Sequence, residues 1–227
     1  MKKLAIVGTS YNNELAPYHD QDYEIWGMAF ALIQSEVKRI DKIFELHLKS
    51  EYSQDTSQFI YDTELPVYMQ KKDKKVKNCL LFPFEEIRKK YGDYFTSTWA
   101  LALVFAIEEG FKDIELYGIN FETDRERTIE RACIEYYIGY FRGLGYKITL
   151  PESCPLLKSN YFYGLDDILK HRKRIEKKID FYGREKLKYY LKFIQSENGS
   201  EEEKIYYGKY NQYIGFIQGL QMELNQI

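Results

Sequence analysis

The sequence has few cysteines and histidines, and no spacing that would join them into a familiar site. Cys79, Cys133 and Cys154 are odd in number, lie far apart and form no C-x-x-C pair. This spacing argues against a disulfide framework and a structural zinc site, and it predicts reduced, mostly buried thiols. Only three histidines occur in the 227 residues. No metal site is predicted.

Long apolar runs and an excess of charge of one sign are also missing. The apolar run Leu4–Val7 is too short for a signal peptide. No run approaches the roughly 18 apolar residues that a membrane span requires. The 33 basic and 35 acidic residues leave a net charge of −2, which argues against general nucleic-acid binding. We therefore expect a cytoplasmic protein that binds neither membranes nor nucleic acids in general.

What the sequence does contain is an alternation of short strand and helix patterns. Strands are predicted at residues 3–8, 23–27, 39–47, 66–69, 80–83, 112–121 and 146–150. Helices are predicted between them, most clearly at 99–110 and 134–144. This order predicts an α/β protein, in which residues 1–160 form a Rossmann-like, mostly parallel sheet with helices on both faces.

After residue 160 the pattern changes to long, tyrosine-rich helices. Apolar residues recur at alternating steps of four and three, as in a coiled-coil seam, at Tyr206, Tyr210, Tyr213, Ile217, Leu220 and Leu224. We predict that residues 161–227 form a helical hairpin or coiled-coil appendage. Two alternatives stay open: the hairpin packs on the domain, or residues 165–227 join copies of the chain into a homo-oligomer.

Two turns rich in hydroxyl residues are candidate phosphate sites at the carboxyl edge of the predicted sheet. Their residues are Gly8, Thr9, Ser10, Thr96, Ser97 and Thr98. Glycine lets the backbone approach a ligand closely, and hydroxyls at the start of a helix bind anions or cap the helix. Gly27, which ends the second strand, belongs to the same predicted edge. The first turn is neither a G-x-G-x-x-G fingerprint nor a P-loop, which disfavours a dinucleotide enzyme or a P-loop kinase.

Glu45 and His47 form the predicted acid–base pair. Two residues apart at the end of a strand, they point to the same face. A histidine beside a carboxylate exchanges protons near neutral pH. The alternative is an ordinary hydrogen-bonded pair at the edge of the sheet. His19, in the preceding polar loop, could reach the same cleft.

A second polar group follows the predicted strand at 112–121. Gly118 and Asn120 lie at its end, and Glu122 and Arg131 come after it. An amide here could read a base or a sugar hydroxyl, the carboxylate could bind a ribose or a metal, and the arginine could face phosphate. The alternative is a charged loop that faces solvent.

Three blocks of the sequence together resemble a known group of enzymes. They are Ile6–Ser10, Thr96–Ser97 and Gly110–Phe121. The chain resembles the bacterial sialyltransferase-like glycosyltransferases and the related Maf-type flagellin-modification proteins. In these, a G-x-x-S loop, a T-S helix start and a G-[YF]-K-x-I-x-L-x-G-[IV]-[DN]-F strand surround a nucleotide. It looks closer still to Rossmann-like proteins encoded by phages, which share the blocks seen here as Tyr23–Gly27 and Phe44–His47.

The resemblance implies a nucleotide- or nucleotide-sugar-binding protein of the bacterial host cytosol that is glycosyltransferase-like. It places Gly8 and Ser10 at phosphate or ribose, Thr96 and Ser97 at the nucleotide, and Asn120 at the mouth of the pocket. The sialyltransferases carry their base histidine downstream of the Gly110–Phe121 block, whereas this chain has no histidine between His47 and His171. That departure keeps open a non-catalytic phage protein that sequesters a nucleotide signal or binds a host factor. A third alternative is an assembly component that multimerises through residues 165–227.

Overall fold

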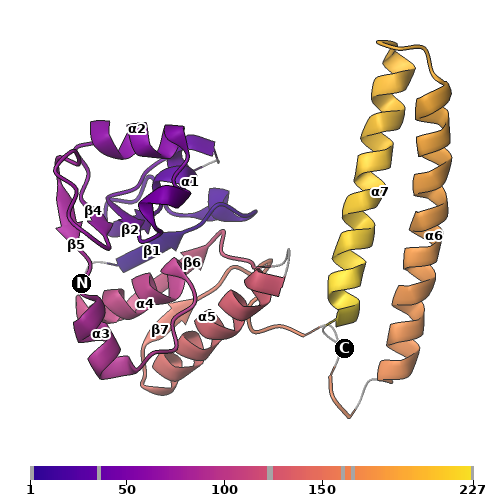
Figure 1. Cartoon of the computed structure of the whole chain (residues 1–227). Coiled ribbons are helices and arrows are strands. Elements are labelled where there is room, and N and C mark those ends of the chain that lie inside the picture. The colour runs from indigo at the N-terminus through magenta and orange to yellow at the C-terminus, as the bar shows by residue number, and fades with distance from the viewer. Residues whose placement is uncertain (1–2, 35–36, 122–124, 160–161, 165–166, 226–227) are drawn as a thin grey trace. The chain divides into compact units, whose positions relative to one another are not determined.

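The computed structural model describes residues 3–34, 37–121, 125–159, 162–164 and 167–225 (Figure 1). The chain divides into two compact units. The first comprises Met1–Phe121 with Glu126–Leu157, and the second comprises Glu122–Arg125 with Lys158–Ile227.

The first unit is built on a parallel sheet of seven strands. In chain order they are β1 (Lys3–Val7), β2 (Tyr23–Gly27), β3 (Lys42–Glu45), β4 (Val67–Met69), β5 (Cys79–Leu81), β6 (Asp113–Tyr117) and β7 (Lys147–Thr149). Their order in the sheet is β5-β4-β3-β2-β1-β6-β7, and each neighbouring pair is parallel. The strand order therefore reverses between β1 and β6, which is where such sheets commonly bind ligands.

Helices cover both faces of this sheet (Figure 1). They are α1 (Ala29–Gln34), α2 (Gln54–Asp62), α3 (Phe84–Tyr91), α4 (Thr98–Glu108) and α5 (Arg125–Gly143), with short 3-10 turns η1 (Asn13–Leu15) and η2 (Lys49–Glu51). Successive side chains of β1 enter different cores, because a strand points alternate residues to opposite faces. Leu4 and Ile6 pack with α3, α4 and α5, whereas Ala5 and Val7 pack with α1 and α2. The predicted α/β class with helices on both faces is confirmed.

The helix α4 is the best-buried helix of the unit. Nine of its eleven residues are buried, and Ser97 caps it by accepting a hydrogen bond from the backbone N–H of Ala100. A helix that is apolar all round belongs inside a fold. Because α4 leads into β6 of a parallel sheet, it runs against the strands. Its first residues therefore lie at the carboxyl edge of the sheet.

Several predicted element boundaries differ from the structure, and three of them bear on the predicted site residues. β3 ends at Glu45, so His47 lies beyond the strand. β6 ends at Tyr117 because Gly118 adopts a left-handed backbone with φ 63°. α5 begins at Arg125 and not at residue 134, since charged residues that fit a loop also fit the exposed side of a helix.

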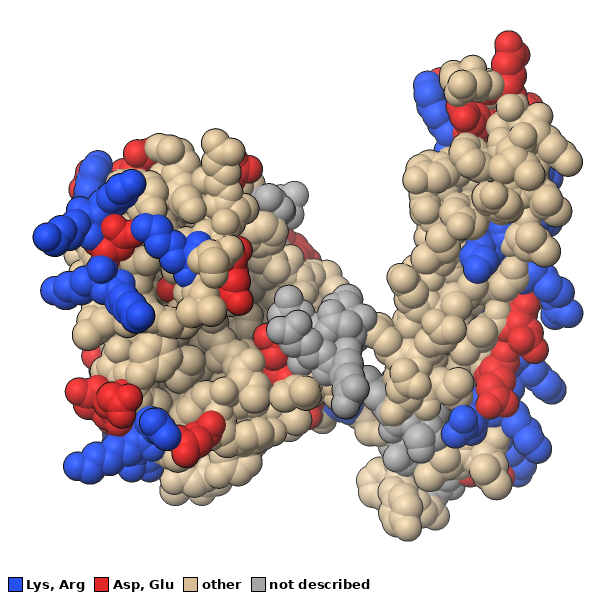
Figure 2. Space-filling model, viewed as in Figure 1, with Lys and Arg blue, Asp and Glu red and all other residues tan. Residues whose placement is uncertain are grey.

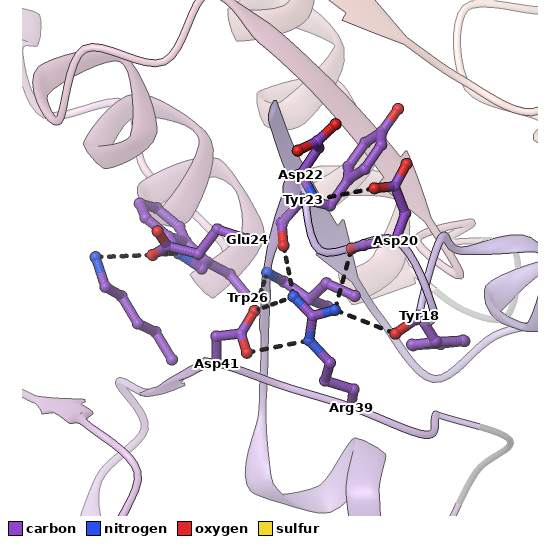
Figure 3. A network of polar contacts seen from close by, with 10 residues as sticks. Tyr18, Asp20, Asp22, Tyr23, Glu24, Trp26, Arg39 and Asp41 are labelled. Carbon is purple, nitrogen blue, oxygen red and sulfur yellow. Dashed lines mark hydrogen bonds and ion pairs between the residues drawn. The ribbon is translucent and has the colours of Figure 1, made fainter. Parts of the chain in front are cut away.

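A polar network at the amino edge of the sheet joins the loop before β2 to the segment before β3 (Figure 3). All five N–H groups of the Arg39 guanidinium are used. Nε and Nη2 donate to the carboxylate of Asp41, Nη1 donates to the carbonyls of Tyr18 and Asp20, and Nη2 also donates to the carbonyl of Tyr23. This edge lies opposite the carboxyl ends of the strands, so the network positions the frame of the sheet and not the candidate site.

The second unit is a pair of long helices, α6 (Ile168–Gln195) and α7 (Glu201–Asn225). Aromatic rings join them: Tyr189 packs against Tyr206 and Tyr213, and Tyr190 against Tyr210. The predicted tyrosine seam of α7 is thus used within the chain, and the predicted helical appendage is confirmed as a helix pair. Among the described residues of the two helices, Ile175 alone is buried. Self-association through residues 165–227 stays a prediction.

In the described part of the chain, no helix combines the length and the apolar character needed to cross a membrane.

Candidate functional site

Where the strand order reverses, the loop after β1 and the loop after β6 pack directly against each other. The backbone N–H of Gly8 donates to the carbonyl of Tyr117 at 2.8 Å, and that of Ser10 donates to the carbonyl of Gly118 at 3.0 Å. A Cβ atom on Gly8 would lie 2.2 Å from the Gly118 oxygen. The two glycines are therefore required by the close approach of the loops. These two amides are engaged within the protein, so a phosphate role here depends on the Thr9 and Ser10 hydroxyls and stays a prediction.

Buried asparagines complete this junction. Asn12 Oδ1 accepts from the Gly118 N–H at 2.7 Å, and Asn120 Nδ2 donates to the Tyr11 carbonyl at 3.2 Å. Asn120 is 2% exposed. Its Oδ1 and the Nδ2 of Asn12 have no hydrogen-bond partner among the described residues. Sequence reasoning missed Asn12, although an asparagine in the left-handed region, with φ 67°, is typical of such turns.

The second predicted turn and the charged residues near α5 make structural contacts. Thr96 Oγ1 donates to the Ile129 carbonyl at 3.2 Å, while Ser97 and Thr98 are buried at the start of α4. Arg131 pairs with Glu135 at 2.9 Å and donates to the Pro155 carbonyl at 2.8 Å. These contacts occupy groups that were expected to face a ligand, and their ligand roles stay predictions.

Glu122 and Gly27 were also predicted to lie beside a ligand at this edge of the sheet. Glu122 lies outside the described residues. Gly27 packs closely on the segment before β3, because a Cβ atom there would lie 2.6 Å from Cδ1 of Ile40. The glycine at this position is therefore explained by packing, and its place beside a ligand stays a prediction.

Glu45 and His47 are brought together as a hydrogen-bonded pair. His47 Nδ1 lies 3.0 Å from Glu45 Oε1. The glutamate side chain is 3% exposed and the histidine side chain 47% exposed. A carboxylate oxygen accepts, so Nδ1 carries the hydrogen and Nε2 is the nitrogen left to a ligand. The arrangement gives a half-exposed histidine oriented by a buried carboxylate.

Side chains from two other elements fix the backbone that carries this pair. The Tyr52 hydroxyl donates to the carbonyl of Glu45 at 3.1 Å and to that of His47 at 3.3 Å. Gln70, just after β4, donates from Nε2 to the carbonyl between them, that of Leu46. Three consecutive carbonyls after β3 are thus held in place. Neither Tyr52 nor Gln70 was singled out in the sequence. Gln70 lies 24 residues after Leu46, and Tyr52, although only five residues after His47, belongs to no local pattern that predicts its contacts.

The electrostatic surroundings favour the protonated form of His47. Its hydrogen bond to Glu45 raises the pKa of the imidazole above its ordinary value of 6.5, and partial burial acts in the opposite direction. The charges of Glu45, Glu51 and Glu130 raise it further. A histidine with such neighbours keeps its proton to a higher pH than a free imidazole does.

Two cavities meet at His47 and Tyr52. The smaller, of about 220 Å³, is called here the carboxylate pocket. It is lined by Met28, Phe30, Glu45, His47, Glu51, Tyr52, Ser53 and Thr56. The larger, of about 540 Å³, is called the lysine cleft. It is lined by His47, Leu48, Lys49, Tyr52, Met69, Gln70, Lys71, Lys72, Asp73, Lys74 and Lys75.

The carboxyl ends of β2, β3 and β4 therefore carry the open part of the site. Figure 2 shows lysine and arginine side chains gathered around the strands β4 and β5. The lysine run of residues 71–77 reads in sequence as a solvated turn, and the structure adds a concave surface to it. His19 lines neither cavity and is exposed. Within the described residues, no group of three or more His, Cys, Asp or Glu side chains is arranged to hold a metal ion.

No family model, curated protein or solved structure matches this chain. The parallel α/β fold is compatible with nucleotide binding.

Proposed function

We propose that the chain binds a nucleotide or nucleotide-sugar at the carboxyl edge of its sheet and transfers the glycosyl group to an acceptor hydroxyl. The observation that carries the proposal is the position of His47. It is oriented by the buried Glu45 and stands where two cavities of opposite lining meet. A relationship to the sialyltransferase-like and Maf-type transferases is part of the proposal, and the parallel fold is compatible with it.

In this mechanism His47 acts as the general base. Nε2 takes the proton of the acceptor hydroxyl while the acceptor oxygen bonds to the anomeric carbon, and the bond from that carbon to the nucleotide phosphate breaks. The electron pair leaves with the phosphate, so atoms and charge balance. Glu45 holds the ring in the Nδ1–H form and stabilises the imidazolium that results.

The other end of Glu45 supports a ligand with hydroxyl groups. Its Oε2 is buried and has no hydrogen-bond partner among the described residues, and Glu45 lines the carboxylate pocket. A buried carboxylate oxygen without a donor is costly. A sugar or ribose hydroxyl in this pocket would supply the missing donor.

The test is a thermal-shift screen of the full chain against nucleotides and nucleotide-sugars, followed by a turnover assay on each ligand that stabilises it. His47→Ala is expected to lower kcat/KM by about 10² to 10⁴-fold, the usual contribution of a general base. His19→Ala is the matched control, since that histidine is exposed and lines neither cavity. It should keep the activity of the parent.

Two results would overturn the transferase. A stabilising ligand that is recovered intact after long incubation with acceptors would identify a binding protein that sequesters nucleotides. Equal activity of the His47→Ala and His19→Ala variants would remove His47 from the chemistry.

A further inference from the structure

The lysine cleft is a concentration of positive charge in a chain whose net charge is −2. Five lysines and one aspartate line it, which gives the lining a charge of +4 apart from His47. Its volume of about 540 Å³ lies within the range typical of small-ligand pockets.

The lysines of the cleft are of two kinds. Lys49 and Lys75 are held in place: both lie over the ring of Tyr61, at 5.6 and 5.7 Å from its centre, and Lys49 also pairs with Asp73 at 2.6 Å. The other three form no ion pair with any described residue and are exposed; they are Lys71, Lys72 and Lys74. Positioned cations beside uncompensated ones favour an anion of high charge density.

We infer that the lysine cleft binds the phosphate of the nucleotide-sugar. The inference rests on the proposed function, and it sets the orientation of the ligand. The phosphate lies among the lysines after β4, the sugar enters the carboxylate pocket, and the bond between them falls beside His47, which lines both cavities. Ammonium groups so placed stabilise the charge that develops on the departing phosphate.

This orientation also explains why the two cavities differ in charge. Unpaired carboxylates would repel a phosphate group. Glu45 and Glu51 line the carboxylate pocket, and the one carboxylate that lines the lysine cleft, Asp73, is paired with Lys49. Hydroxyl groups of a sugar donate well to such carboxylates. The inference thus places the phosphate at the open carboxyl ends of β3 and β4, whereas the sequence predicted it at the junction between β1 and β6.

Inorganic pyrophosphate is the probe that tests the cleft without any glycosyl chemistry. Binding is measured by isothermal titration with the full chain at several salt concentrations. The triple variant Lys71→Glu/Lys72→Glu/Lys74→Glu is expected to raise Kd by about tenfold or more and to flatten its salt dependence. The control Lys38→Glu/Lys89→Glu/Lys112→Glu makes the same change of net charge at exposed lysines outside the cleft. It should change Kd by less than about twofold.

The results separate the cleft from the proposed function. Absence of pyrophosphate binding, or an equal loss in both triple variants, overturns the cleft as a phosphate site. Turnover of a nucleotide-sugar with an unchanged KM in the cleft variant overturns the cleft and leaves the transferase standing. Pyrophosphate binding that no nucleotide-sugar competes for overturns the inference that the cleft holds the donor, and it too leaves the transferase standing. Stronger competition by a single-stranded oligonucleotide assigns the cleft to a nucleic-acid backbone and overturns the inference.

Discussion

At the scale of single residues, Glu45 is a buried carboxylate whose two oxygens have different surroundings. One of its oxygens bonds to His47 at 3.0 Å, and the other is buried without a partner among the described residues. Hydrophobic packing gains nothing from a carboxylate at such a position, and desolvation of the charge costs free energy. The imidazolium form of His47 offsets part of this desolvation cost. In the proposed complex, a ligand hydroxyl in the carboxylate pocket would offset more of it.

The pair makes a prediction about proton binding that needs no ligand. The pKa of His47 should lie above 6.5 in the parent protein, because the hydrogen bond to Glu45 stabilises the imidazolium. Glu45→Gln keeps the shape and removes the charge, so the pKa should fall. The measurement is a pH titration of the histidine ring protons by NMR, which the presence of three histidines makes simple to assign. An unchanged pKa in Glu45→Gln would show that the pair is not electrostatically coupled.

The raised pKa of His47 also makes the free energy of unfolding depend on pH. A histidine whose pKa is raised by folding binds its proton more tightly in the native state than in the unfolded chain. The stabilisation is complete below pH 6.5 and is lost as the pH rises through the native pKa. As a general base His47 acts in its neutral form, so kcat/KM should rise with pH over the same interval in which this stabilisation is lost.

At the scale of elements, Arg39 joins three segments of the chain. It bonds to the loop before β2, to the start of β2 and to Asp41, just before β3, through its five N–H groups. Its side chain is 21% exposed. A lysine keeps the charge but presents neither the planar fork nor the same number of directed donors. The network therefore depends on geometry more than on charge.

Arg39→Lys is accordingly expected to lower the free energy of unfolding by about 2–3 kcal/mol, because the Asp41 carboxylate and the part-buried carbonyls of Tyr18 and Tyr23 lose donors. The measurement is denaturant unfolding followed by circular dichroism. Arg88→Lys is the control: that arginine is 63% exposed and pairs with Asp93 on the surface, so the change should stay within about 0.5 kcal/mol. Equal effects of the two changes would contradict the structural role of the network.

The elements also show what a single sequence can and cannot predict. The strand β1 and the helix α4 were predictable because their apolar residues form unbroken local patterns. The Glu45–His47 pair was predictable because two residues at a spacing of two share a face. Neither required knowledge of a distant contact.

The closed junction and the lysine cleft could not be predicted in this way. The contact of Gly8 with Gly118 joins residues far apart in the chain, and a glycine turn of the same composition also binds phosphate. The lysines of residues 71–75 read as a solvated turn because their local pattern is the same whether the turn is flat or encloses a hollow. In both cases the same local sequence fits two different arrangements, and contacts with distant residues determine which of them forms.

At the scale of the whole molecule, the sheet unit contains both hydrophobic cores. The two clusters of buried residues end with Leu156 in the sequence, and neither includes a residue of α6 or α7. The helix pair, by contrast, has aromatic contacts along its length and Ile175 as its buried residue among those described. Two units with such different cores should differ in stability, since cooperative unfolding follows buried apolar contact.

A chain ending at Leu157 is therefore expected to fold alone. It keeps every residue of the two clusters and every residue that lines the lysine cleft and the carboxylate pocket. Its cooperative thermal unfolding should match that of the sheet unit in the full chain, and it should bind pyrophosphate with the same Kd. Calorimetry and isothermal titration measure the two quantities. Light scattering on both chains tests the predicted self-association, which should be lost with residues 165–227. An unfolded fragment would mean that the helix pair supplies stability that the two clusters do not contain.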